Sequence, residues 1–147
     1  MAINSLTAAK RVCEATNWTA TNLEVNKILY LAQMMRLGRT SGSQPLVSEH
    51  FQAWDYGPVL PMVYHRLKAF GNGPAGDVFL AFPSIRDTAE ADLIDEAVDS
   101  VKDKTPGQLI AITHWEGGAW AKNYRPGSRN LVIPNADIYE EYRKRVG

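Results

Sequence analysis

The sequence lacks several features that would assign it to a specialised class of protein. It has one cysteine, Cys13, so no disulfide can form within the chain, as is typical of proteins in a reducing compartment. No apolar run approaches the ~18 residues of a membrane span. The first residues show no charged start followed by an apolar stretch, as a secretory signal would. We therefore expect a cytoplasmic protein without a membrane segment.

The chain also lacks an excess of charge of either sign. Its 16 basic and 16 acidic residues give a formal net charge of zero, which removes the simplest argument for a nucleic-acid partner. With 147 residues, 45% of them hydrophobic and 22% charged, the chain suits one globular domain with its own core. The composition excludes disordered and fibrous proteins and predicts a single domain of residues 1–147.

No motif for metal, phosphate or nucleophile chemistry is present. The three histidines, His50, His65 and His114, have no second His or Cys at a metal-ligand spacing. The segment Gly71-Asn72-Gly73 lacks the lysine and the following helix of a phosphate loop. Cys13 is the one nucleophile candidate, and a cysteine on the inward side of a short helix is usually inert. We predict no cofactor, no metal and no enzymatic activity, with a small enzyme that uses His114 as a distant alternative.

A helical pattern fills most of the sequence. Thr21-Asn22-Leu23-Glu24 has the form of a capping box, and it opens a helix expected over residues 21–37, with Gly38 as a natural stop. Apolar residues occupy nearly the whole circumference of this segment, which is typical of a helix in the middle of a fold. We expect three of its side chains to be almost fully buried: Ile28, Leu31 and Met35.

Shorter elements are predicted on both sides of this helix. Further helices are expected over 7–15, from Val59 to about residue 70 with Pro61 in the first turn, over 87–103 with Asp87 and Glu90 as a capping pair, over 105–114, and over 135–145. A short strand is expected within 47–54, ended by a turn at Gly57-Pro58. The fold class is therefore mainly α (α+β): a compact helical domain around a buried central helix, with a small β-element.

Two groups of residues are candidates for binding a partner. Carboxylates occupy the polar face of the 87–103 helix: Asp92, Asp95, Glu96, Asp99 and Asp103. They form either an ordinary solvated face or a surface that steers a basic partner. Aromatic residues lie beside Gly and Pro at the ends of elements: Trp54, Tyr56, Tyr64, Trp115, Trp120 and Tyr124. They either fix a corner of the core or anchor a partner.

One segment has a long and specific pattern. Residues 53–64, Ala-Trp-Asp-Tyr-Gly-Pro-Val-Leu-Pro-Met-Val-Tyr, resemble the central motif of the Panacea domain, the family of SocA-type antitoxins and phage-associated GepA-like proteins. That family shows Trp, two residues, Gly-Pro-Val, then a Pro and a Val-Tyr pair. Asn26-Lys27-Ile28-Leu29-Tyr30-Leu31-Ala32 is similar to the family helix that precedes this motif. Thr113-His114, followed by Trp120, is similar to its later Thr-His and Pro-Trp, with Ala119 in place of the usual Pro. The resemblance covers about residues 23–142.

This resemblance implies a cytoplasmic bacterial or prophage antitoxin that neutralises a co-encoded protein toxin by direct binding. SocA-type members are also linked with delivering a toxin to a Clp-type AAA+ protease, so a proteolytic adaptor is the alternative. Toxins paired with the domain are diverse, so the target is not identified. Many members carry an additional DNA-binding segment, and the stretch before the matching region is too short for one. Within the motifs we assign structural roles to Gly57, Pro58, Pro61 and His114, with His114 paired to Trp120.

Overall fold

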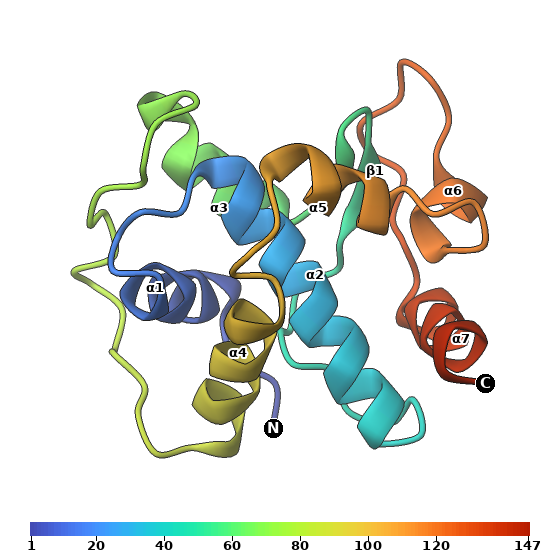
Figure 1. Cartoon of the computed structure of the whole chain (residues 1–147), viewed down its shortest axis with the longest axis horizontal. Helices are drawn as coiled ribbons and strands as arrows, with labels where there is room; N and C mark the ends of the chain where they lie inside the picture. Colours follow the sequence, from blue (N-terminus) through green and yellow to red (C-terminus); the bar gives the residue numbers. More distant parts are fainter.

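In the computed structural model, which describes residues 1–147, helix α2 (Asn22–Arg39) runs diagonally through the middle of the molecule (Figure 1). Its predicted capping box is formed. Thr21 Oγ1 accepts a hydrogen bond from the Glu24 backbone N–H at 3.2 Å, and Glu24 Oε1 accepts one from the Thr21 N–H at 3.0 Å. These two bonds satisfy donors that a helix start otherwise leaves free, so a local sequence signal positions the central helix.

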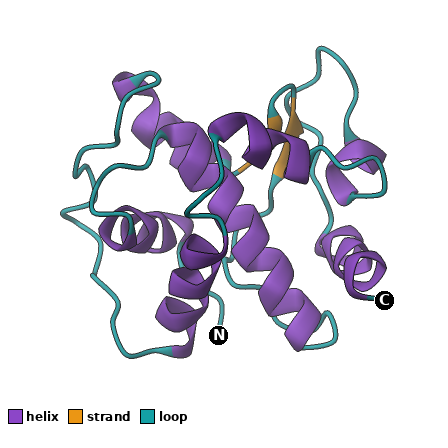
Figure 2. Cartoon of the chain, viewed as in Figure 1, coloured by secondary structure: helices purple, strands orange, loops and turns teal.

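Six more α-helices and one 3-10 turn surround α2: α1 (Ser5–Ala15), α3 (Pro61–Leu67), η1 (Lys68–Phe70), α4 (Ala89–Ser100), α5 (Pro106–Thr113), α6 (Ala119–Asn123) and α7 (Asn135–Val146). Helix α2 packs against α1, α3, α4, α5 and α7. Figure 2 shows that helices dominate and that the strands form one small element beside α5. The expected mainly α fold around a central helix is confirmed. None of these helices combines the length and the apolar character that crossing a bilayer requires.

The β-element is a hairpin of two three-residue strands. Strands β1 (Gln52–Trp54) and β2 (Gly57–Val59) pair antiparallel, with Trp54 opposite Gly57, so the loop between them is Asp55-Tyr56. Only the end of the predicted strand 47–54 is therefore extended in a sheet. The free edge of β1 is covered by residues 131–133: Ala53 N–H donates to Leu131 O, and Ile133 N–H donates to Phe51 O, both at 2.8 Å. A segment 80 residues downstream in the sequence thus completes the hairpin.

The burial of α2 is less symmetric than the sequence predicts. Ile28 is 4% exposed, as expected, but Leu31 and Met35 are only half-buried, so this part of the prediction is wrong. These two residues are four apart and share a stripe that the neighbouring helices leave partly uncovered. Polar side chains take buried positions elsewhere on the helix. One example is Gln33, whose Oε1 accepts hydrogen bonds from the backbone N–H groups of Leu46 and Val47.

Gly38 does not end the central helix, contrary to the prediction. The helix continues to Arg39, and a Cβ atom at Gly38 would overlap the ring of Tyr142 on α7. Gly38 therefore allows two helices to pack closely, and it does not end the central helix. A local sequence signal cannot distinguish these two uses, because the second depends on a residue more than 100 positions away.

Two further helix starts differ from the sequence prediction. The N-cap of α4 is Thr88, whose Oγ1 accepts a hydrogen bond from the Ala91 N–H at 3.0 Å, while Asp87 lies outside the helix at φ +53°. Helix α3 starts at Pro61 and not at Val59, because Val59 belongs to β2. In both cases the residue that was predicted to start the helix belongs to the segment before it.

Candidate partner-binding site

Three sequence motifs meet at the β1–β2 hairpin. Lys27 of α2 is 1% exposed, and its Nζ donates a hydrogen bond to the carbonyl oxygen of Pro58 at 3.0 Å. A Cβ atom at Gly57 would lie 2.9 Å from Lys27 Cε and 3.1 Å from His114 Nε2. Gly57 also has φ +113°, a backbone conformation that residues with a side chain rarely adopt. The Gly-Pro motif is therefore fixed by a buried lysine from one side and by His114 from the other.

Burial shifts both ionisable groups at this point toward their neutral form. Burial lowers the pKa of Lys27 to about 7. Burial also lowers the pKa of His114, with a smaller effect in the same direction from the Lys27 charge, and the backbone of Tyr56 opposes the shift. His114 Nε2 is buried and makes no hydrogen bond within the protein. The arrangement is that of a packed structural corner and not of a general base held ready by a carboxylate.

A stack of three rings holds the hairpin against α5 and α6. His114 and Trp120 stack at 3.7 Å between ring centroids with planes 12° apart, and Trp120 stacks on Tyr124 at 4.5 Å. Trp120 Nε1 donates a hydrogen bond to the carbonyl oxygen of Trp54 at 2.7 Å, and the Tyr124 hydroxyl donates one to Asp55 at 2.5 Å. His114 and Trp120 are in contact, as expected from the sequence, and the stack holds the start of the Asp55-Tyr56 loop in place.

Trp54 and Tyr64 pack at the base of the hairpin, as predicted. Their rings meet edge to face at 4.9 Å between centroids, and Trp54 is 7% exposed. The guanidinium of Arg129 lies 4.2 Å from the centre of the Trp54 ring and covers it from the solvent side. Trp54 therefore contributes to the core of this corner and offers little surface of its own to a partner.

Only two of the candidate aromatic anchors reach far into solvent. Tyr56, at the tip of the hairpin, is 71% exposed, and Trp115, which follows His114 directly, is 37% exposed. Trp120 and Tyr64 are half-buried. The guanidinium of Arg145 lies 4.7 Å from the centre of the Trp115 ring, which restricts that ring without burying it. Together Tyr56 and Trp115 form the exposed aromatic pair of the site.

The acidic face of α4 is largely neutralised within the protein. Asp95 forms a two-bond ion pair with Arg11 of α1, at 2.8 and 2.5 Å. Glu96 forms a similar pair with Arg39 of α2, at 2.9 and 2.5 Å. A further carboxylate, Asp99, lies 3.2 Å from Lys102. Of the candidate carboxylates within α4, Asp92 alone makes no ion pair, and Asp103, which lies beyond the end of the helix, makes none either. The cations come from other helices in the first two cases, so the helix pattern of the sequence does not show this pairing.

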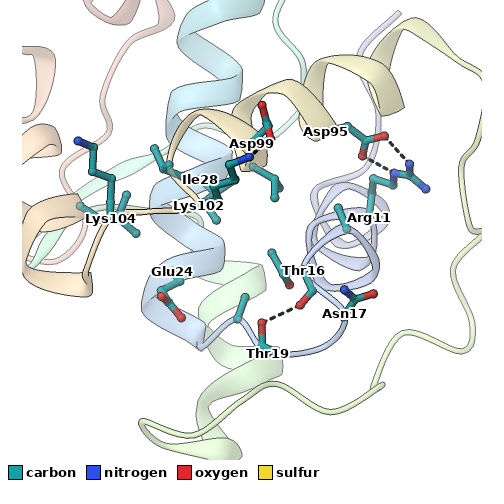
Figure 3. Close-up of a pocket in the computed structure, with 15 residues that line it drawn as sticks. Arg11, Thr16, Asn17, Thr19, Glu24, Ile28, Asp95, Asp99, Lys102 and Lys104 are labelled. Atoms are coloured by element: carbon teal, nitrogen blue, oxygen red, sulfur yellow. Dashed lines mark hydrogen bonds and ion pairs between the residues drawn. The ribbon is translucent and has the colours of Figure 1, made fainter.

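Two of the pockets on the surface of the molecule have volumes above 500 Å³. The first, of about 540 Å³, lies between α1, the start of α2 and the end of α4. Figure 3 shows its walls, where Arg11 is bound to Asp95 and Lys102 to Asp99, so its charges are mostly satisfied. The second, of about 560 Å³, lies beside the hairpin, and its lining includes Lys27, Trp54 and Tyr56. Of the exposed aromatic pair, Tyr56 lines the second pocket and Trp115 does not.

No set of side chains suited to catalysis appears around these features. Cys13 is fully buried, and burial raises the pKa of its thiol to about 12, so it stays protonated at neutral pH. No three His, Cys, Asp or Glu side chains lie close enough together to hold a metal ion. The His114 ring stacks on Trp120, and its Nε2 makes no hydrogen bond to a serine, threonine or cysteine.

Sequence reasoning missed the buried polar residues that hold the site. Lys27 lies on a helix that also contains Glu24, Asn26 and Gln33, so its burial is not visible in the sequence pattern. Its place in the family-like segment 26–32 is the one signal that could have identified it. Glu141 of α7 is 1% exposed and accepts hydrogen bonds from the Tyr30 hydroxyl at 2.5 Å, the Ala119 N–H at 2.9 Å and Arg145 Nε at 2.8 Å. In the sequence it resembles any other charged residue of a terminal helix. Arg129 lies in a loop whose sequence gives no sign that it covers Trp54.

The comparison with known families matches the part of the chain that forms this corner. The family model for "Antitoxin SocA-like, Panacea domain" matches residues 25–121, a range that contains Lys27, Gly57, Pro58, His114 and Trp120. The chain therefore belongs to the SocA-like Panacea family of antitoxins.

A named relative is found in Caulobacter vibrioides (strain NA1000 / CB15N). The chain is 31% identical to its Antitoxin SocA over an alignment of 113 residues, and the match covers 67% of this chain and 57% of that protein. The match thus spans little more than half the length of the relative. No solved structure matches the chain.

Proposed function

We propose that this protein is the antitoxin of a bacterial or prophage toxin–antitoxin pair, and that it neutralises a co-encoded toxin in the cytoplasm by binding it directly. Family membership supports the antitoxin role. The observation that carries direct binding is the exposed aromatic pair of Tyr56 and Trp115, presented on a corner that buried contacts hold in place. Aromatic side chains at rigid positions make favourable anchors, because binding costs them little conformational entropy.

The other candidate residues take supporting roles in this proposal. Trp54, Tyr64 and Trp120 hold the hairpin that presents Tyr56. The acidic face contributes mainly through Asp92, because exposed carboxylates already in ion pairs add little to affinity. Charge reversal at Asp92 should change the association rate more than the dissociation rate. A stable complex with a toxin calls for an interface of about 800 Å² per partner or more, so the aromatic pair forms its centre and not its whole.

The test is co-expression with the product of the adjacent gene, followed by affinity purification and growth measurements. Tyr56→Ala and Trp115→Ala should each speed dissociation of the complex and weaken it by ~2 kcal/mol or more. Leu80→Ala is the control, because Leu80 is 83% exposed on the loop before α4, on the far side of the molecule from the hairpin (Figure 1). That variant should bind like the unmodified protein.

Two outcomes would count against the proposal. If no complex forms and cells tolerate the adjacent gene product equally well with and without this protein, the antitoxin function is wrong. If the toxin disappears rapidly only when this protein and a Clp-type protease are both present, the protein acts as an adaptor and not by sequestration. The half-life of the toxin in cells with and without the protease separates the two mechanisms.

A further inference from the structure

The pocket beside the hairpin has an aromatic wall and an opening rich in positive charge. It lies between the start of α2, the hairpin, the end of α3 with the loop that follows it, and the loop after α6. Trp54 and Tyr64 form the wall, and Lys27 lies at its buried end. Its volume of about 560 Å³ is within the usual range for sites that enclose a small ligand or a side chain.

The cations of this pocket have no acidic partner within the protein. Arg129 and Lys68 line the pocket, are exposed and form neither an ion pair nor a side-chain hydrogen bond, in contrast to Arg11 and Arg39 elsewhere. The one carboxylate in the lining is Asp55, which already accepts a hydrogen bond from the Tyr124 hydroxyl.

The start of α2 adds two free backbone donors. The N–H groups of Asn22 and Leu23, which line the same pocket, make no hydrogen bond within the protein. They lie at the positive end of the helix dipole of an 18-residue helix. One cavity is therefore lined by three sources of unpaired donors: Arg129, Lys68 and the start of α2. These donors favour an anionic group in the cavity.

We propose that this pocket binds the carboxylate of an aspartate or glutamate side chain of the bound toxin; the identity of that partner rests on the proposed function. The guanidinium carbon of Arg129 lies over the aromatic wall, 4.2 Å from the Trp54 ring centre and 5.8 Å from that of Tyr64. These cation–π contacts keep the guanidinium beside the pocket, and its N–H groups, which have no acceptor within the protein, can bind a carboxylate through two hydrogen bonds.

Two observations favour an acidic side chain over a phosphate group. Tyr56 lines the pocket and also belongs to the exposed aromatic pair, so one bound segment can contact both. The glycine-containing loop at Gly71-Asn72-Gly73 follows a helix and does not precede one, so its N–H groups do not form the phosphate-binding loop that leads into a helix. The pocket therefore extends the proposed toxin surface and adds a charged contact to its aromatic anchors.

The first experiment needs no toxin. The ¹⁵N-labelled protein is titrated with N-acetyl-glutamate amide and, in parallel, with N-acetyl-glutamine amide, which has the same shape without the charge. The glutamate compound should shift the Trp54 indole signal and the Asn22 and Leu23 amide signals, and Arg129→Gln should reduce its affinity at least about tenfold. Arg125→Gln, in the same loop but outside the pocket, should leave the titration unchanged. Equal shifts with both compounds, no shift at all, or a response to inorganic phosphate alone would overturn the proposal.

The second experiment uses the product of the adjacent gene. The double variant Lys68→Glu with Arg129→Glu should weaken the complex at least about tenfold, while Arg125→Glu should not, and thermal melts should show all these variants folded because the side chains are exposed. If the unmodified protein binds the toxin and the double variant binds it equally well, this inference is wrong and the proposed function stands. If the unmodified protein binds no toxin, the proposed function is wrong, and the glutamate titration alone decides whether the pocket binds a carboxylate.

Discussion

At the scale of single residues, the structure depends on a glycine, a buried lysine and a histidine that meet at one point. Gly57 is required both by its positive φ and by the absence of space for a side chain. The sequence predicted the turn, because Gly-Pro after an apolar run is a strong local signal. It could not predict that Lys27 and His114 fill the space beside it, because those contacts join residues 30 and 57 positions away.

Gly57→Ala tests the space at this position. We expect a loss of about 2 kcal/mol or more in the free energy of unfolding, since alanine is strained at this φ and its methyl group would press on Lys27. Gly71→Ala is the matched control: Gly71 also has a positive φ, +56°, but no atom lies within 4 Å of the added carbon. It should lose clearly less than Gly57→Ala, because only backbone strain applies there. Chemical denaturation measures both variants, and equal losses would show that the contacts at Gly57 do not matter.

The buried Lys27 predicts how stability depends on pH. Its pKa of about 7 in the folded protein lies well below that of an exposed lysine. Between pH 7 and pH 8.5 the unfolded chain therefore keeps a proton that the folded protein releases, so the free energy of unfolding rises with pH. The rise is at most about 1.4 kcal/mol per pH unit. Above this window the raised pKa of the Cys13 thiol makes the free energy of unfolding fall with pH. Below this window the lowered pKa of His114 makes the free energy of unfolding rise with pH.

Lys27→Met should remove this rise, because a methionine of similar length has no proton to release. The measurement is the denaturation midpoint at pH 7.0, 7.75 and 8.5 for both proteins. Stability curves that run parallel over this window would show that Lys27 is not the group responsible.

At the scale of secondary-structure elements, local signals predicted the helices well and their contacts poorly. The capping boxes at Thr21–Glu24 and Thr105–Gln108 are both formed, because such signals act within one turn. The short helix α6 was not predicted, since it has five residues and no side-chain cap. The role of Gly38 was misread for a related reason: its neighbour Tyr142 belongs to a distant helix.

The uneven burial of α2 gives a direct comparison of two leucines. Leu29 is fully buried and Leu31 is half-buried on the same helix. Leu29→Ala should cost ~2–5 kcal/mol in unfolding free energy, as for a buried leucine whose removal leaves a cavity. Leu31→Ala should cost clearly less, because solvent already reaches its side chain. Urea denaturation of both variants checks this order, and the reverse order would mean that the Leu31 stripe is covered in solution.

One buried carboxylate contributes strongly to the contact between α2 and α7. Glu141→Ala would leave the Tyr30 hydroxyl and the Ala119 N–H without their acceptor. We expect a loss of ~3 kcal/mol or more, the usual cost of removing one member of a buried charged network. Glu140→Ala, at an exposed position one residue earlier, is the control and should stay within about 0.5 kcal/mol of the unmodified protein. Thermal melts that do not separate the two variants would contradict this role for Glu141.

At the scale of the whole molecule, the sequence predicted the family and the type of surface but not the shape of the site. The residues of the Trp-Gly-Pro motif and of the Thr-His motif were recognised because each motif is contiguous in the chain. Their meeting with Lys27, and the pocket covered by Arg129, depend on the tertiary fold. Burial also decided which aromatic residues remain available to a partner, and it left Tyr56 and Trp115 as the exposed pair.

The bond between Tyr30 and Glu141 also has a consequence for synthesis on the ribosome. It joins positions 111 residues apart, so a nascent chain must reach α7 before the central helix gains its last buried partner. Until then the Tyr30 hydroxyl and the face of α2 that receives α7 remain open to water and to proteases. A chain whose synthesis stops before residue 141 therefore lacks both this bond and the packing of α7 against the central helix.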